Sequence, residues 1–310
     1  GPEVYLGFEP QWILLKRTSG TNSWALFDCM RGIVTEGYDP VLEPDGNVAE
    51  YTTTQYLDIT STGFKLKGSF NQSNGDGENY IFTCIRRSDG YVGKPPSLGT
   101  DVFAMDVGNG SDTIPTFDSG FPVDMRLYKA PASGGTWYHW FLGTRLMGQQ
   151  YLSTNDTDSE VGDSWALWDS NVGDAIGHGS ANQAWQWKRH AGFDCICFKG
   201  DSVAGRQVPH SLNKTPEMLW VKRRTSGTAR DWMVYHKGLN GGTNPEQYGL
   251  VLNTTAAEVD QADLWNDTAH SSTHFTLGGS PSTNSDTIDY IAMLFASVDG
   301  ISKVGSYDGS

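Results

Sequence analysis

The middle third of the sequence is unusually rich in aromatic side chains. The run TWYHWF (136–141) is followed by Trp165, Trp168, Trp185 and Trp187. Successive side chains of a strand point to opposite faces, so Tyr138 and Trp140 share one face. Both faces of such a strand are buried only when the strand is covered on both sides. One set of rings is therefore expected to be exposed.

An exposed indole beside Asn, Asp and Gln is typical of a sugar-binding site. The apolar face of the sugar stacks on the ring, and polar groups bind the hydroxyls. We predict a ligand site at four tryptophans: Trp140, Trp168, Trp185 and Trp187. The alternative is that these rings pack against a neighbouring repeat or subunit.

An acidic loop, NDTDSE (155–160), is the second place with distinctive chemistry. Calcium prefers about six to eight oxygen ligands, so Asp156, Asp158 and Glu160 are candidate metal ligands. The loop lacks the glycine and the spacing of an EF-hand, and a solvated acidic turn is the alternative reading. No other cofactor is predicted.

The sequence contains no motif for catalysis. It has no P-loop, dinucleotide fingerprint, HExxH or GxSxG pattern. A glycosidase needs two carboxylates about 5–10 Å apart, but no acid recurs in equivalent strands of the repeats described below. We therefore predict no catalytic residue and a protein that is not an enzyme, and we keep a glycan depolymerase as an alternative.

Composition limits the classes of partner. The formal charge is 22 − 36 = −14, and Lys and Arg do not cluster, which disfavours nucleic acid and anionic membranes. No apolar run approaches the ~20 residues of a membrane-spanning helix. The four cysteines are too few for a disulfide scaffold. Cys195 and Cys197 are expected to be buried, and a Cys29–Cys84 bridge stays open.

The elements that carry these residues are short strands. Apolar segments of 5–8 residues alternate with clusters of Gly, Ser, Asn, Asp and Pro, a pattern typical of β-sandwiches and barrels. At roughly 100–200 residues per domain, 310 residues predict two or three domains. The expected class is all-β, with tandem antiparallel, jelly-roll-like sandwiches.

Internal repetition supports three domains. GFEPQWILLKRTSGT (7–21) matches KTPEMLWVKRRTSGT (214–228), which aligns Arg17–Thr21 with Arg224–Thr228, and GFPVDMRLYK (120–129) is a weaker middle copy. The apolar strands in 79–93, 193–205 and 289–305 are expected to close the three copies. The predicted repeats are 1–95, 96–205 and 206–310, and the second is divergent and aromatic-rich.

Three segments carry a resemblance to a known group of proteins. GFEPQWILLKRTSGTNSWALFDCMRG, YLDITSTGF and YIAMLFASVDGISKVGSYDG resemble repeats in tail-fibre-like proteins of marine bacteriophages, cyanophages included. The resemblance covers most of the first and third copies and is loose in the second. It implies an extracellular virion appendage, often built from several chains, and it supplies no functional residues.

Together these observations predict a tail-fibre or receptor-binding segment that recognises a host-surface polysaccharide without catalysis. Its other partners would be further virion proteins, and a homo-oligomer such as a trimer is possible for a fibre. The alternatives are a structural virion spacer or capsid decoration, and the depolymerase named above. Neither nucleic acid binding nor membrane insertion is predicted.

Overall fold

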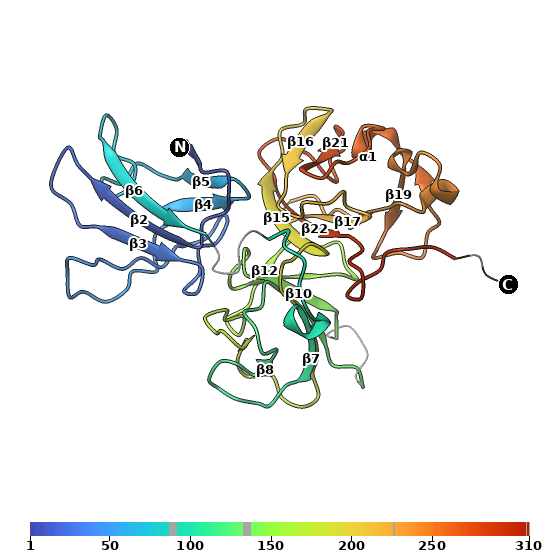
Figure 1. Cartoon of the computed structure of the whole chain (residues 1–310), viewed down its shortest axis with the longest axis horizontal. Coiled ribbons are helices and arrows are strands. Elements are labelled where there is room, and N and C mark those ends of the chain that lie inside the picture. Colours follow the sequence, from blue (N-terminus) through green and yellow to red (C-terminus); the bar gives the residue numbers. More distant parts are fainter. Residues whose placement is uncertain (87–91, 133–137, 226, 308, 310) are drawn as a thin grey trace.

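The computed structural model describes residues 1–86, 92–132, 138–225, 227–307 and 309. Trp137, in the run 136–141, lies outside the described residues. Almost all regular structure is antiparallel β-sheet, which confirms the predicted all-β class. Figure 1 shows three lobes, here called unit 1 (1–86), unit 2 (92–190) and unit 3 (191–309). Within the described ranges, no helix is long and apolar enough to cross a bilayer.

Units 2 and 3 have the same topology. Unit 2 contains one six-stranded sheet, and its strands in spatial order are β12 (Val161–Gly162), β11 (Gln150–Ser153), β10 (Phe141–Thr144), β9 (Met125–Lys129), β14 (Gln183–Trp187) and β7 (Phe103–Val107). A second small sheet pairs β8 (Phe117–Asp118) with β13 (Gly173–Asp174). A 3₁₀ turn, η1 (Gly99–Asp101), precedes β7.

Unit 3 repeats this order strand for strand. Its large sheet runs β20 (Val259–Asp260), β19 (Tyr248–Val251), β18 (Met233–His236), β17 (Met218–Arg223), β22 (Asp289–Phe295) and β15 (Phe193–Lys199). Its small sheet pairs β16 (Arg206–Pro209) with β21 (His274–Leu277). Two 3₁₀ turns, η2 (Leu239–Gly242) and η3 (Pro245–Gln247), and the one-turn helix α1 (Ala262–Trp265) lie between strands.

Unit 1 is a shorter version of the same plan. One sheet runs β3 (Ala25–Asp28), β2 (Trp12–Arg17), β6 (Tyr80–Ile85), and the other runs β1 (Glu3–Tyr5), β5 (Gly63–Leu66), β4 (Leu57–Thr60). By position, β2, β3 and β6 correspond to β17, β18 and β22 of unit 3. The side chains of β2 alternate between deep and partial burial, as expected for a strand on one wall of a sandwich.

Strand β15 differs from the sequence prediction. It was expected to close the second repeat, but it pairs along its whole length with β22 and opens unit 3. Its run FDCICFK places apolar side chains on both faces, and six of its seven residues are buried. A strand of this kind needs cover on both sides wherever it lies, so its composition does not reveal which sheet it joins.

The register of β2 and β17 also corrects the repeat alignment. Lys16 and Lys222 lie opposite Ile81 and Ile291, and Arg17 and Arg223 lie opposite Tyr80 and Tyr290. Arg17 is therefore equivalent to Arg223 and not, as the RTSGT match suggested, to Arg224. Arg224 takes the place of Thr18.

A single buried cluster joins the three units. It includes Ile13 and Phe27 of unit 1, Leu142 of unit 2, and Cys195 and Met293 of unit 3. The outward faces of the large sheets in units 2 and 3 meet in this cluster, where the Trp187 and Phe193 rings lie 6.2 Å apart. The four cysteines are free thiols, and Cys195 and Cys197 are buried as predicted.

Unit 2 has a buried ion pair where its siblings have aliphatic packing. Arg126 is fully buried, three residues before Lys129, whereas Ile13 and Leu219 hold the equivalent positions before Lys16 and Lys222. Its guanidinium pairs with the buried Asp174 carboxylate and lies 4.8 Å from the centre of the Tyr128 ring. Burial raises the pKa of Asp174, so this carboxylate depends on Arg126 for its charge.

We expect Arg126→Leu to lower the free energy of unfolding by about 3–5 kcal/mol, because it leaves the Asp174 charge buried without its counter-ion. Arg126→Leu combined with Asp174→Asn removes that charge and is expected to recover a large part of the loss. Urea denaturation of the wild type, the single variant and the double variant measures these free energies of unfolding. A double variant no more stable than the single one would contradict a role for charge compensation here.

Candidate functional site

The first candidate site is a pair of indoles on the outward face of the unit 2 sheet. Trp140 immediately precedes β10 and Trp185 lies in β14, and their ring centres are 5.3 Å apart with 36° between the planes. Both rings are half-buried. The ammonium of Lys129 lies 5.6 Å from the centre of the Trp140 ring and donates to the Tyr138 carbonyl at 2.6 Å. This contact holds Trp140 against the sheet.

The strand register defines the surroundings of Trp185. It lies directly between Met105 of β7 and Leu127 of β9, and Met105 is 64% exposed. The nine positions of β7, β14 and β9 on this face are Phe103, Met105, Val107, Gln183, Trp185, Trp187, Met125, Leu127 and Lys129. None of these nine is a carboxylate. These nine positions can stack an apolar surface and bind polar groups, but they carry no acid pair.

A groove continues this face toward unit 3. It has a volume of about 750 Å³ and is lined by Phe103, Met105 and Trp187 from unit 2 and by Phe193 and Phe295 from unit 3. Trp187 packs on Phe103 at 5.0 Å between ring centres. Trp187 therefore serves both as a wall of the groove and as part of the contact between the units.

Trp168 does not belong to this face. Its side chain is only 5% exposed, and its Nε1 donates to the Gly148 carbonyl at 2.8 Å. The ring centre lies 5.6 Å from the Arg126 guanidinium. The prediction of a ligand-binding role for Trp168 is wrong, because the ring is used to enclose the buried Arg126. Of the four predicted tryptophans, Trp140 and Trp185 form the open pair and Trp187 lies at its inner end.

The acidic loop does not form the predicted metal site. Glu160 binds the Arg224 guanidinium at 2.7 Å, and Asp156 faces His139 at 3.9 Å. Asp158 is exposed beside Lys222. In the part of the chain that the structure describes, no group of three or more His, Cys, Asp or Glu side chains is placed to hold a metal. The loop instead faces the cationic side chains of unit 3.

Lys222 shows how this loop is held. Its buried ammonium donates to the Thr157 carbonyl at 2.7 Å and to the Arg230 carbonyl at 2.6 Å. Burial lowers the pKa of Lys222 to about 8, against the opposing influence of Asp231, Asp158 and Asp156. The acids of the loop thus favour the charged form of a lysine that unit 3 buries.

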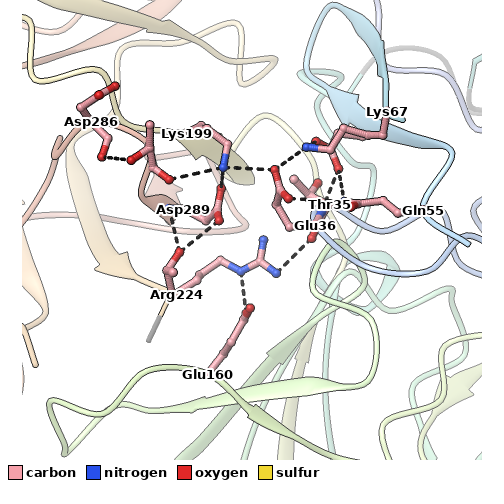
Figure 2. A network of polar contacts seen from close by, with 12 residues as sticks. Thr35, Glu36, Gln55, Lys67, Glu160, Lys199, Arg224, Asp286 and Asp289 are labelled. Atoms are coloured by element: carbon pink, nitrogen blue, oxygen red, sulfur yellow. Dashed lines mark hydrogen bonds and ion pairs between the residues drawn. The ribbon is translucent and has the colours of Figure 1, made fainter. Parts of the chain in front are cut away.

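The second candidate site is the polar network where all three units meet (Figure 2). The buried Arg224 of unit 3 binds Glu160 of unit 2 and donates to the Thr35 carbonyl of unit 1 at 3.1 Å. Nothing in the repeat pattern identified this residue as special except the doubled arginine of KRRT, where unit 1 has KRT.

Lysines and acids extend the network between units 1 and 3. Lys199 lies 2.8 Å from Asp289 and 3.3 Å from Glu36. Lys67 lies 2.6 Å from both Glu36 and Asp58. These groups border a cavity of about 350 Å³. Each of these charged groups has an opposite charge within hydrogen-bonding or ion-pair distance.

Burial affects the two acids beside Lys67 differently. Burial alone would raise the pKa of Glu36, but Lys67 and Lys199 outweigh it and bring the pKa to about 2. Asp58 is more deeply buried, and burial raises its pKa despite the contact with Lys67. The acids Glu36, Asp58, Glu160 and Asp289 each face a lysine or an arginine, so these charge pairs join the three units.

Among the comparisons with known proteins, the comparison with protein-family models assigns the chain to a family. A family model described as "Domain of unknown function (DUF7483)" matches residues 1–88 and 143–310. Trp185 and Trp187 fall inside the matched ranges, and Trp140 falls outside them. No curated protein and no solved structure matches the chain.

The lowered pKa of Glu36 predicts how the free energy of unfolding depends on pH. A carboxylate whose pKa is lowered on folding stabilises the protein above its ordinary pKa, and this stability is lost as the pH falls toward the folded-state value. Glu36→Gln is therefore expected to lower the free energy of unfolding by roughly 1–3 kcal/mol at pH 7. The deficit should shrink as the pH falls from about 4.5 toward 2.

Urea denaturation of the wild type and the variant at pH 7 and pH 3 measures this effect. The matched control is Asp76→Asn, which removes an exposed carboxylate of the same unit and is expected to change little at either pH. A Glu36→Gln deficit that is the same at both pH values would show that the side chain stabilises by packing and not by its charge.

Proposed function

The chain belongs to the DUF7483 family, and we propose that it is a non-enzymatic carbohydrate-binding protein whose site is the outward face of unit 2. The observation that carries this proposal is the Trp140–Trp185 pair, with ring centres 5.3 Å apart on a sheet face whose nine positions in β7, β14 and β9 include no acid. Rings held this way present a firm apolar platform at low cost in conformational entropy, because an indole has only two side-chain torsions.

The chemistry of the face suits a polysaccharide. A pyranose ring presents C–H groups on one side, which stack on indoles, and hydroxyls at its edge, which need donors and acceptors. Lys129 supplies a donor next to Trp140, and Gln183 lies opposite Lys129 in the register. The groove beside Trp187 and Met105 offers room for further sugars of an extended chain.

Binding without cleavage follows from the same residues. Glycoside hydrolysis ordinarily needs two carboxylates on either side of the scissile bond, and the nine paired positions of this face include none. A depolymerase would have to recruit its acids from elsewhere. The face therefore supports recognition better than catalysis.

A rigid structural spacer is the second candidate function. The observation in its favour is the buried cluster that spans all three units and includes Trp187 as a partner, together with the paired charges around Arg224. The two functions are compatible, because a stiff module can carry a binding face. The setting in a virion appendage, with other virion proteins or a homotrimer as partners, rests on the sequence resemblance alone. In such an assembly several weak sites would add up to useful avidity.

A glycan array with the purified chain tests the proposal, followed by titration of the glycans that bind. Trp140→Ala and Trp185→Ala are each expected to weaken binding at least tenfold while leaving the unfolding transition in place. The matched control is Trp165→Ala, which removes a 51% exposed indole elsewhere in unit 2. Equal binding by all three variants, or release of reducing ends from the bound glycan, would contradict the proposal.

A further inference from the structure

The outer edge of β6 in unit 1 is open, whereas the equivalent edge is filled in both other units. In unit 2 the strand β7 pairs with β14, and in unit 3 the strand β15 pairs with β22. β6 pairs only with β2 among the described residues. In unit 2 the nine residues 108–116 connect the filling strand β7 to β8. In unit 3 the six residues 200–205 connect the filling strand β15 to β16. Among the described strands of residues 1–310, none holds this place in unit 1.

The equivalence of β6 and β22 rests on side-chain contacts as well as register. Tyr80 and Tyr290 lie opposite Arg17 and Arg223. The Tyr80 hydroxyl accepts from the Gly75 N–H and donates to the Asn71 carbonyl. The Tyr290 hydroxyl accepts from the Ser285 N–H and donates to the Pro281 carbonyl. The same side chain thus anchors the same turn in both units.

The open edge leaves apolar side chains uncovered. Ile81 is 53% exposed and Phe82 is 47% exposed, whereas their equivalents Ile291 and Ala292 are fully buried. Ile85 is also more than half exposed. Phe82 points inward, because it lies opposite the buried Leu15 and packs on Phe64 at 6.0 Å. An inward-facing ring with this exposure marks the place where the next strand of the sheet is absent.

The described strand β6 itself contains none of the sequence features that keep exposed strands from pairing. Natural edge strands are commonly protected by charged residues, proline or a bulge. The sequence of β6, YIFTCI, has neither charge nor proline, and its six residues pair with β2 without interruption.

The backbone of β6 also presents N–H and C=O groups that no strand in the described part of the chain pairs with. The carbonyls of Asn79 and Ile85 accept from Thr18 and Gln11 on the β2 side. In an antiparallel pair alternate residues point to the same side, so the N–H and C=O groups of Tyr80, Phe82 and Cys84 point to the open edge.

We propose that β6 accepts, antiparallel, an extended strand of the β15 kind that is not part of residues 1–310. The precedent within this chain sets its chemistry: apolar side chains on both faces, as in FDCICFK, so that one face covers Phe82 and the other covers Ile81 and Ile85. Addition of a strand to an open sheet edge is an established mode of recognition between polypeptides.

A labelled synthetic peptide of residues 192–200 with Cys195→Ala and Cys197→Ala serves as the probe, and fluorescence anisotropy measures its binding to the intact chain. We expect saturable binding with Kd below ~100 µM. Cys84→Pro removes an N–H that faces the open edge and is expected to weaken binding at least tenfold. The control Cys84→Ala keeps that N–H and should bind within about twofold of the wild type.

Hydrogen exchange locates the bound peptide without relying on the variants. Bound peptide is expected to slow exchange in the segment 79–86 and not in β7 or β20. The absence of binding at millimolar peptide, equal binding by Cys84→Pro, or protection elsewhere would overturn the proposal. It would also be overturned by a dimer of the chain alone, seen in sedimentation and lost in Cys84→Pro, because the edge would then belong to a second copy. Glycan binding by unit 2 is a separate measurement, so failure of either proposal leaves the other standing.

Discussion

A β-sheet that is apolar on both faces must be covered on both, and this requirement shapes the whole chain. In unit 3 the inner face of the large sheet packs on β16 and β21 through side chains such as Val221, Phe275 and Leu294. The outer face, with Cys195 and Met293, is buried against unit 2 and unit 1. Because these outer faces contribute to one shared core, the three units are packed against one another rather than joined only by linkers. Hydrophobic burial therefore fixes their relative placement.

Ion pairs and charged hydrogen bonds between the units select the orientation in which their apolar faces pack. The hydrophobic effect is not directional, so it does not by itself select one orientation of two packed sheets. Arg224 contacts an acid of unit 2 and a backbone carbonyl of unit 1 at once, and Lys199 and Lys67 share Glu36 between units 3 and 1. Breaking a buried pair leaves an uncompensated charge and costs more than the pair contributes. The network therefore penalises other arrangements more than it adds to stability.

The places where this packing stops are the places available for function. Trp187 takes part in the contact between units 2 and 3, whereas Trp185 and Trp140 lie further along the same sheet face and pack on each other as half-buried rings. The same reasoning applies to β6, because its equivalents β14 and β22 each lie between two neighbouring strands of a six-stranded sheet. The aromatic face of unit 2 and the open edge of unit 1 are thus two variations on one repeated plan: unit 2 carries additional aromatic side chains, and in unit 1 no described strand pairs with the outer edge of β6.

The sequence by itself determined the class of fold and the chemistry available. Alternating apolar residues and turn clusters were enough to predict an all-β chain, because the period of two along a strand is a local property. The aromatic density around Trp140 and Trp185 was visible for the same reason. Tertiary structure alone decided which sheet β15 joins, since FDCICFK needs cover on both faces in any sheet. It also decided that Trp168 is buried while Trp185 is only half-buried, and that Glu160 binds an arginine rather than a metal. Each of these outcomes depends on a partner far away in the chain, such as Arg126 for Trp168 and Arg224 for Glu160, and no local pattern records such a partner.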